Sequence, residues 1–228
     1  MTIEDRRPRG SGPGPITPDG CAVELYSRLP AHGEPAIVGG AVPAGCTILE
    51  LGAGTGRITR PLLELGYRVT AVDESQEMLD RIHGAETVLE SIENLELNRT
   101  FDAVLMMSYL VATADPVQRR AWLSTCRRHV RADGLVLLQR HSPRWFDTAT
   151  PYERAEGTIS MRLSGIERPA DGLLTATMQY TSGDDQWSHT YTHDRWDAEV
   201  MHHDLEACGL RFDSFITPDE GWLIVRPE

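Results

Sequence analysis

A strand that leads directly into a glycine-rich turn constrains this chain more than any other feature. Residues 48–73 read ILELGAGTGRITRPLLELGYRVTAVD. The apolar run at 47–51 predicts a short buried strand, and the stretch after the turn predicts a helix through about Leu65, closed by Gly66. Glycine permits a sharp bend and the close approach of a ligand, and we expect Gly56 to let the helix start against the strand. This unit predicts a site for a nucleotide-like cofactor.

The alternation of strands and helices continues beyond this unit. Its predicted strands lie at 68–72, 86–89, 101–107 and 135–139, and its predicted helices at 75–82 and 116–130. Ser75 is a suitable N-cap, and Asp133-Gly134 is the expected turn into the last of these strands. Strands that alternate with helices favour a doubly wound α/β fold around a mostly parallel, Rossmann-like sheet.

After Ser142 the pattern changes to a period of two, which is typical of antiparallel strands. It predicts strands at 158–166, 173–180 and 187–194, with a hairpin turn at Asp171-Gly172. A helix at 197–207 and two strands at 211–217 and 222–225 complete the pattern. We therefore expect an antiparallel β insertion before the last helix and a C-terminal hairpin.

The chain is expected to form one domain, residues 18–228, behind a flexible tail. The proline and glycine content of residues 1–17 predicts this tail. A helical stripe at 19–29 should end before Pro30, because the residue before a proline avoids the helical conformation. The expected parts of the domain are an N-terminal helical lid at 18–42, a cofactor-binding core at 43–142, a β insertion covering the substrate at 143–196, and the last helix and strands at 197–228.

Composition excludes several function classes. The 228 residues include no lysine, since all 22 basic side chains are arginine. A phosphate-loop lysine, a Schiff-base lysine and the Tyr-x-x-x-Lys pair of short-chain dehydrogenases are therefore excluded. A formal net charge of −12 and the absence of a basic stripe argue against a nucleic-acid partner.

Other bulk features favour a soluble cytoplasmic protein. No apolar run approaches the roughly 20 residues of a membrane span, and the first residues are not expected to be a signal peptide, because no apolar stretch follows their paired arginines. The four cysteines lie far apart in the sequence, which is typical of reduced thiols. No set of His, Cys and carboxylate residues has metal-ligand spacing, so no metal is expected. The sequence leaves open whether the chain is a monomer or a homodimer.

Two residues beside the glycine turn bear on the choice of cofactor. A dinucleotide fold needs glycine or alanine where this chain has Arg57. Glu50 lies two residues before the first glycine, where a carboxylate would repel a pyrophosphate but attract the ammonium and sulfonium of S-adenosylmethionine. Asp73, at the end of the second strand, can accept the ribose hydroxyls of either cofactor.

The pattern E-x-G-x-G-x-G, the strand ending in VD and the following S-x-x-M-L resemble the class I S-adenosylmethionine-dependent methyltransferase family over residues 43–140. The resemblance implies a seven-stranded sheet with one antiparallel strand in its last hairpin. It also implies that Glu50 lies near the methionine amino group, that Asp73 holds the ribose and that Glu74 flanks the adenine. The remaining implied cofactor residues are Gly52, Ala53, Gly54 and Gly56 along the methionine and ribose, Ser91 and Ile92 at the adenine, and Met107 and Ser108 with carbonyls toward the ammonium.

The adenine end departs from the family pattern in two places. Ser91 stands where the family often has an acidic residue that accepts the adenine amino group. Glu74 stands where the family often has an apolar residue that stacks on the adenine. The adenine end is therefore less well defined than the ribose end.

Three residues are candidates for catalysis on the acceptor side. His141 follows the fifth strand at the carboxyl edge of the sheet, where open α/β folds bind ligands, and is the candidate general base. Tyr26, on the first helix, could close over the cofactor or orient the acceptor. Tyr191 shares one face of a predicted strand with Trp187, His189 and His193, and this face suits a planar or cationic acceptor. Ordinary packing would also account for each of these residues.

The function expected from this sequence is methyl transfer from S-adenosylmethionine to a carbon, nitrogen or oxygen of a small metabolite. The whole chain is similar to small-molecule methyltransferases of actinobacterial specialised metabolism, including enzymes that methylate the indole of tryptophan-derived cyclic dipeptides. That similarity implies an aromatic, indole-like acceptor. The alternatives are a nicotinamide- or flavin-dependent oxidoreductase and a non-catalytic S-adenosylmethionine-binding partner protein.

Overall fold

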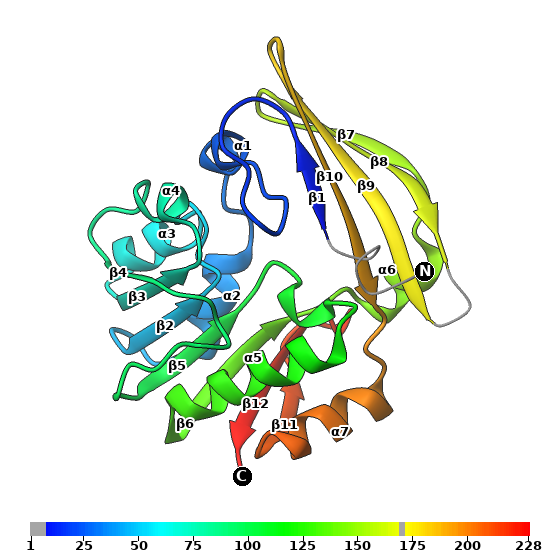
Figure 1. Ribbon diagram of the computed structural model, residues 1–228. Coiled ribbons are helices and arrows are strands. Elements are labelled where there is room, and N and C mark those ends of the chain that lie inside the picture. The colour runs from blue at the N-terminus through cyan, green and yellow to red at the C-terminus, as the bar shows by residue number, and fades with distance from the viewer. Residues whose placement is uncertain (1–7, 169–171) are drawn as a thin grey trace.

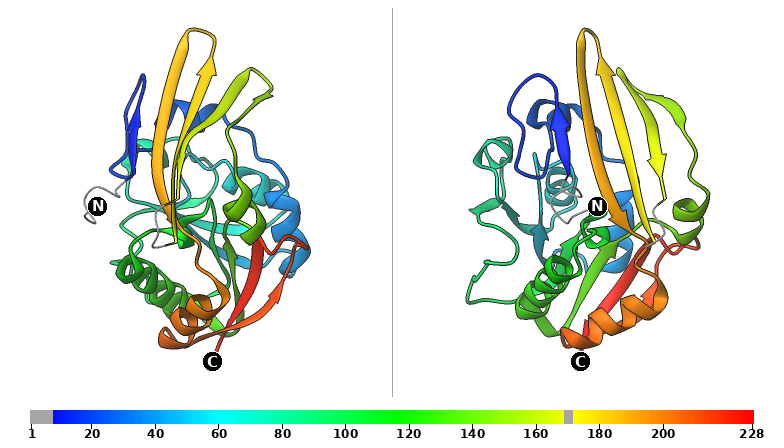
Figure 2. Two further views of the ribbon diagram at one scale, coloured as in Figure 1. Left: turned by 90° about the vertical axis from the view of Figure 1, so that its right-hand side faces the viewer. Right: turned by 45° about the vertical axis from the view of Figure 1, so that its right-hand side comes forward.

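Two sheets organise the chain, which we describe from a computed structural model at residues 8–168 and 172–228. The core sheet has seven strands in the order β11–β12–β6–β5–β2–β3–β4. The second sheet has five strands in the order β1–β10–β9–β8–β7, and we call it the acceptor sheet. Figure 1 shows the acceptor sheet as a separate layer that rises from the end of β6, and Figure 2 shows the same layer from two other sides.

The core sheet has the predicted topology. Its strands are β2 (Thr47–Leu51), β3 (Arg68–Asp73), β4 (Glu86–Leu89), β5 (Phe101–Met106), β6 (Val130–Gln139), β11 (Leu210–Phe215) and β12 (Trp222–Pro227). Five strands that are neighbours in the sheet pair in parallel, in the order β6–β5–β2–β3–β4. Strand β12 runs antiparallel to both of its neighbours, β6 and β11. The expected doubly wound α/β sheet with one antiparallel strand in its last hairpin is therefore confirmed.

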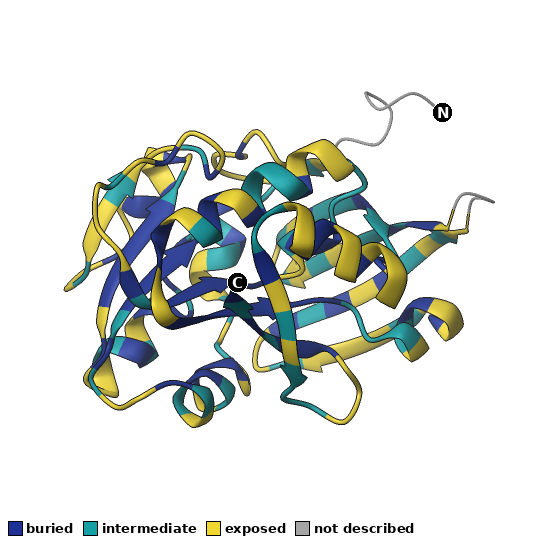
Figure 3. Cartoon of the chain, turned by 90° about the horizontal axis from the view of Figure 1, so that it is seen from below, coloured by how far each residue is buried: buried dark blue, intermediate teal, exposed yellow. Residues whose placement is uncertain are grey.

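Helices cover both faces of the core sheet. The helices of the described residues are α1 (Val23–Arg28), α2 (Glu34–Ala41), α3 (Thr59–Glu64), α4 (Gln76–Leu79), α5 (Pro116–His129), α6 (Pro143–Thr148) and α7 (Ala198–Ala207). Of these, α1 and α6 pack against the acceptor sheet instead of the core sheet. Alternate residues of β5 point to opposite faces, so that Val104 joins the apolar cluster under α5 and α7 while Leu105 joins the cluster under α2 and α3. Figure 3 shows these strands as the buried centre of the molecule.

The acceptor sheet confirms the predicted alternation. Its long strands are β8 (Ile159–Glu167), β9 (Leu173–Ser182) and β10 (Asp185–Asp194). In their register Tyr191 is opposite Ala176 and His193 is opposite Leu174, so the residues expected on one face do share it. The other face carries threonine pairs, with 3.0 Å between the hydroxyls of Thr175 and Thr192.

The expected flexible tail is wrong where the structure describes it. β1 (Arg9–Ser11) pairs antiparallel with β10. A Cβ on Gly10 would lie 1.8 Å from the carbonyl oxygen of Gly20, and one on Gly12 would lie 2.3 Å from the ring of Trp187. These glycines therefore permit close packing of the backbone, and a composition argument misread them as a sign of flexibility. Residues 1–7 lie outside the described residues.

Four further elements differ from the sequence prediction. α2 is not part of a lid, because its Val38 is fully buried in the core cluster with Ile48. α6 and β7 (Tyr152–Glu156) stand at the start of the insertion, where no element was predicted. Asp133-Gly134 lies in a bulge inside β6 instead of in a turn before it, because the pairing with β5 moves from Val130 to Leu135 within two residues of β5. Asp171 lies outside the described residues.

A buried ion-pair network fixes the base of the acceptor sheet to the core. The guanidinium of Arg119, on α5, donates to Asp204 on α7 at 2.8 Å and to Asp194 at the end of β10 at 2.9 Å. Arg119 and Asp204 are each only 1% exposed. Trp196 donates its indole N–H to Asp204 at 3.1 Å. The end of the acceptor sheet is thus held by a buried guanidinium, although Asp194 itself is 25% exposed.

Among the residues described, no helix combines the length and the apolar character that crossing a membrane requires.

Candidate functional site

Three glycines shape the turn that follows β2. All have a positive φ: 67° at Gly52, 56° at Gly54 and 77° at Gly56. A Cβ on Gly52 would lie 2.7 Å from Leu110, and one on Gly56 would lie 2.8 Å from Ile82. A Cβ on Gly54 would meet no atom within 4 Å. Gly54 therefore borders open space, as a cradle for a ligand requires.

The regular helix after this turn starts later than the sequence suggested. Gly56 was expected to begin the helix, but α3 begins at Thr59 and has six residues. The residues between form successive tight turns, in which Gly56 donates its N–H to Ala53 at 3.1 Å. The turn therefore offers its own backbone groups to a ligand, without the dipole of a regular helix.

Asp73 ties this turn to the end of β3. One carboxylate oxygen accepts the N–H of Gly54 at 2.8 Å, and the other accepts the N–H of Ser75 at 3.0 Å. Each oxygen keeps a second lone pair, so the group can still accept the two hydroxyls of a ribose. Burial raises the pKa of Asp73, and the two backbone N–H groups partly oppose that rise.

Glu50 is a buried carboxylate that forms no ion pair within the part of the chain that the structure describes. It is 2% exposed, and the hydroxyl of Thr59 donates to it at 2.7 Å. Arg57, the nearest arginine along the chain, instead forms a 2.7 Å ion pair with Glu34. Burial raises the pKa of Glu50 to about 7. A buried carboxylate of this kind is stabilised when a cation binds beside it.

The predicted adenine end contains an unpaired hydroxyl. Ser91 Oγ is buried and has no hydrogen-bond partner among the described residues. Ile92 is 9% exposed and lies 4.0 Å from the position of a Cβ on Gly52, so the two border the same turn. Glu74 is exposed, and its partial burial and the charge of Asp19 raise its pKa. An unpaired buried hydroxyl fits a site that a polar ligand completes.

Past β5, the backbone takes an unusual path. Ser108 and Tyr109 are consecutive non-glycine residues with φ of 54° and 65°. The N–H of Ser108 donates to the side chain of Gln139 at 2.8 Å, and the carbonyl of Met107 accepts the N–H of Leu110 at 3.2 Å. Strained backbone of this kind is concentrated at functional sites. Here it turns Tyr109 toward the residues that follow β6.

The acceptor-side candidates fall into two groups. His141 stacks on Tyr109 with 4.1 Å between ring centroids, and Tyr191 lies 6.5 Å away on the same cluster. Tyr26 is separate, because it packs with Tyr180 and the thiol of Cys21 against the outer half of the acceptor sheet. The structure therefore brings His141 and Tyr191 together and leaves Tyr26 in a second group.

Sequence reasoning missed three residues of the His141 cluster as site residues. Trp145 covers the other face of His141 at 4.1 Å, Tyr109 covers the first, and His193 is hydrogen-bonded to its edge at 2.7 Å. His193 could have been found, because it shares a strand face with Tyr191. Nothing in the sequence marks Tyr109, since its place depends on a positive φ at a non-glycine residue.

The N-terminal segment lies between the two groups of predicted residues. The ring nitrogen Nε2 of His189 lies 3.1 Å from the carbonyl oxygen of Asp19, and the indole of Trp187 donates to Pro13 at 3.0 Å. The charge of Asp19 raises the pKa of both Asp73 and Glu74, which places this segment near the cofactor turn. The segment therefore borders both the predicted cofactor residues and the acceptor sheet.

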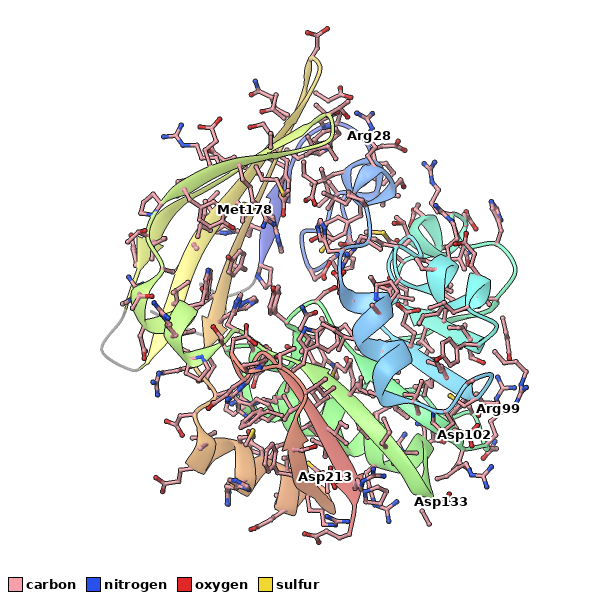
Figure 4. The ribbon with its side chains drawn as sticks, turned by 180° about the vertical axis from the view of Figure 1, so that it is seen from behind. Arg28, Arg99, Asp102, Asp133, Met178 and Asp213 are labelled. Carbon is pink, nitrogen blue, oxygen red and sulfur yellow. The ribbon has the colours of Figure 1, made fainter. Side chains whose placement is uncertain are left out.

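Two surface hollows lie elsewhere, at the amino ends of the core strands. One, of about 460 Å³, is lined by the first residues of four strands, Thr47, Arg68, Glu86 and Phe101. The other, of about 490 Å³, is lined by Asn98 and Arg99. Figure 4 labels Arg99 at this edge and Met178 on the acceptor sheet, well apart from it. No predicted site residue lines either hollow, and parallel α/β sheets bind ligands at the opposite edge.

Comparisons with known proteins identify the central segment. Residues 48–134 match the family described as "Methyltransferase domain". A ubiquinone biosynthesis O-methyltransferase from Xanthomonas oryzae pv. oryzae is 32% identical over 105 residues, which cover 42% of this chain and 43% of that protein. A cypemycin N-terminal methyltransferase from Streptomyces sp. is 32% identical over 148 residues, which cover 59% of this chain and 60% of that protein. The match thus spans less than two thirds of either relative.

A solved structure extends the likeness in fold to nearly the whole chain. The sugar N-methyltransferase KedS8 from Streptoalloteichus sp. superposes with a TM-score of 0.72 at 19% identity, and the alignment covers 96% of this chain and 97% of that one. Residues 48–134 are thus similar to a methyltransferase domain, and the chain as a whole shares the fold of this methyltransferase.

Proposed function

We propose that this chain transfers a methyl group from S-adenosylmethionine to a carbon, nitrogen or oxygen of a small aromatic metabolite. The observation that carries the proposal is Glu50, a buried carboxylate without a cation beside an open glycine turn. The ammonium and sulfonium of the donor would supply the missing positive charge. A diphosphate would add negative charge to the same place and is disfavoured.

The residues present fit the donor at each end. Asp73 offers lone pairs for the ribose hydroxyls, Gly54 borders open space, and Ser91 offers an unpaired hydroxyl toward the adenine. When bound, the donor supplies an electrophilic methyl group on a cationic sulfur. The task of the chain is to hold donor and acceptor at attack distance and to keep water out.

The aromatic class of acceptor is argued from the acceptor sheet. Tyr191 and His193 lie with their rings 4.4 Å apart on its inner face, beside the stack of Tyr109, His141 and Trp145. Flat, largely uncharged walls favour a planar ring such as an indole. The names of the relatives include an oxygen acceptor, a peptide amino terminus and a sugar nitrogen, so the acceptor differs within the family.

Two measurements test the proposal. Calorimetric titration of the chain with S-adenosylmethionine and separately with NADH should show binding of the first alone. Mass spectrometry should then detect S-adenosylhomocysteine and a product heavier by one methyl group with cyclo-(L-Trp-L-Trp), but not with a catechol or an amino sugar.

Each outcome separates the competing functions. Binding of NADH in place of S-adenosylmethionine would favour an oxidoreductase. Binding of S-adenosylmethionine without product from any of the three acceptors would favour a non-catalytic binding partner. Product from the amino sugar or the catechol would keep methyl transfer and contradict the aromatic indole-like acceptor.

A further inference from the structure

One hydrogen bond joins two histidines that come from different sheets. His141 follows β6 of the core sheet, and His193 lies on β10 of the acceptor sheet. Their ring nitrogens, Nε2 of His141 and Nδ1 of His193, are 2.7 Å apart. At this distance one imidazole donates its N–H and the other accepts with its lone pair. The bond therefore fixes the tautomers of the two rings relative to each other.

Both faces of the His141 ring are stacked, so only the edge of the ring can take part in chemistry. Tyr109 covers one face with an interplanar angle of 5°, and Trp145 covers the other with an angle of 14°. Both centroid distances are 4.1 Å, which leaves no room for an acceptor ring on either face. Any role in proton transfer must pass through the nitrogens in the plane of the ring.

The outer nitrogens of the pair belong to two residues that are half-buried. Nδ1 of His141 and Nε2 of His193 have no hydrogen-bond partner among the described residues. Two buried side-chain atoms of the described residues lack a hydrogen-bond partner, Ser91 Oγ and Glu156 Oε2. Neither imidazole nitrogen is one of these buried atoms. Each histidine therefore has one nitrogen engaged in the pair and one that a ligand or water can reach.

We propose that His141 and His193 act as a two-imidazole proton relay, in which His141 takes the proton of the methyl acceptor and His193 passes a proton on to water. The inference rests on the proposed methyl transfer. His141 is the catalytic member, because its free nitrogen meets the acceptor. His193 acts through His141 and is the second member of the relay.

The relay conserves atoms and charge at each step. The acceptor forms a bond to the methyl group, and the sulfur of the donor keeps the electron pair of the broken bond. The acceptor proton moves to Nδ1 of His141 while the Nε2 proton of His141 moves to Nδ1 of His193. The Nε2 proton of His193 then leaves to water, and one proton has been released for each methyl group transferred.

Both imidazoles are poised to be neutral before the reaction. Burial lowers the pKa of His141 to about 3. Burial and the neighbouring histidines His141 and His189 lower the pKa of His193 well below its ordinary value. The other titratable rings packed against the pair are Tyr109 and Tyr191, and burial raises the pKa of both, so they are uncharged as well.

Such a weakly basic pair limits the acceptor class. It can take a proton only from a strongly acidic donor. A neutral aromatic ring carbon or nitrogen becomes strongly acidic once it carries the new methyl group. An aliphatic alcohol or an alkylammonium would need a stronger base before it could attack. The relay therefore favours a neutral heteroaromatic acceptor.

The matched variants are His193→Asn and His203→Asn. An asparagine oxygen lies the same number of bonds from the backbone as Nδ1, so His193→Asn keeps the hydrogen bond to His141 but has no second nitrogen to release a proton. We expect kcat with cyclo-(L-Trp-L-Trp) to fall about 100-fold, with binding of S-adenosylmethionine unchanged. His203 is exposed on α7, and its substitution should leave kcat unchanged. A kcat for His193→Asn within about threefold of the parent would overturn the relay.

A second readout needs neither cofactor nor acceptor. Nuclear magnetic resonance of the ligand-free chain with ¹⁵N-labelled histidine should show one proton coupled to both Nε2 of His141 and Nδ1 of His193, with both rings neutral down to pH 5. Absence of that coupling, or a ring that titrates near pH 6.5, overturns the relay whatever the turnover result. A coupled pair in a chain without turnover contradicts the proposed function alone.

Discussion

The core sheet and the acceptor sheet contribute different kinds of chemical groups to the site. At the end of the core sheet the groups are mainly backbone N–H groups and turns, and Asp73 holds two of these groups in place. On the acceptor sheet the groups are side-chain rings that alternate along regular strands. The first arrangement depends on how strands end, whereas the second depends on which side chains a strand carries. One end of the site is therefore fixed by fold, and the other is set by residue identity.

The largest effect is expected where the two sheets join. Arg119→Met leaves the buried Asp204 without its principal partner, and breaking such a pair costs about 3–5 kcal/mol of unfolding free energy. Urea denaturation measures this loss. Arg120→Met is the matched control, because Arg120 pairs with the same carboxylate at 3.1 Å but is 39% exposed, and it should cost below about 1 kcal/mol. Equal losses in both variants would show that the junction is not anchored by Arg119.

The next effect tests the backbone end of the site. Asp73→Ala leaves the N–H groups of Gly54 and Ser75 unpaired and removes the acceptor for a ribose, so we expect the affinity for S-adenosylmethionine to fall about 100-fold or more. Calorimetry measures the change, with Asp80→Ala, at the exposed C-cap of α4, as the control. Unchanged affinity in Asp73→Ala would remove this residue from the cofactor site.

Glu50→Gln should separate stability from binding. In the folded, ligand-free chain the pKa of Glu50 is about 7, above its ordinary 4.5, so the folded state binds more protons than the unfolded state between these values. The carboxylate therefore costs stability as pH rises through this window, by about 3 kcal/mol above pH 7. Glutamine removes that cost, so the variant should be more stable than the parent at pH 8 and equal to it near pH 4.5.

Denaturation at the two pH values measures the stability difference, and calorimetry at pH 8 should show at least about tenfold weaker binding of S-adenosylmethionine. A variant that is less stable at pH 8 would contradict the absence of a cation beside Glu50.

The smallest effect compares matched glycines in the two regions. Gly54 and Gly183, in the turn between β9 and β10, have φ of 56° and 61°, and a Cβ on either would meet no atom within 4 Å. Alanine at each should cost about 1–2 kcal/mol of unfolding free energy through backbone strain alone. Only Gly54→Ala should also weaken cofactor binding, because its Cβ would enter the space assigned to the ligand. Equal binding by both variants would place the donor elsewhere.

The core sheet was predictable because its signals are local. The apolar run before Gly52 and the cap at Ser75 each act within a few residues, and the bounds of β2 and β4 agree with the prediction. The alternation along β10 likewise placed Tyr191 and His193 on one face. Asp73 and Glu50 follow from strand ends in the same way, and their roles toward a cofactor stay predictions.

What the sequence did not predict depends on contacts between distant segments. β1 pairs with β10, which lies far along the chain. The need for glycine at Gly10 becomes evident only from its close contact with Gly20. The stack of Tyr109, His141 and Trp145 needs a positive φ at Tyr109, which no local pattern encodes. Contacts between rings that come from separate segments cannot be predicted from the spacing of these residues in one sequence.

The position of β1 has a consequence for how the protein is made. Ser11 meets Ser188 across 177 residues of sequence, so the edge strand is synthesised long before its partner. At 5–20 residues per second the interval is roughly 10–35 s. During that time β1 has no strand to pair with. The acceptor side is therefore completed only in the final stage of biosynthesis, and a fusion partner placed before β1 would delay that closure without touching the core.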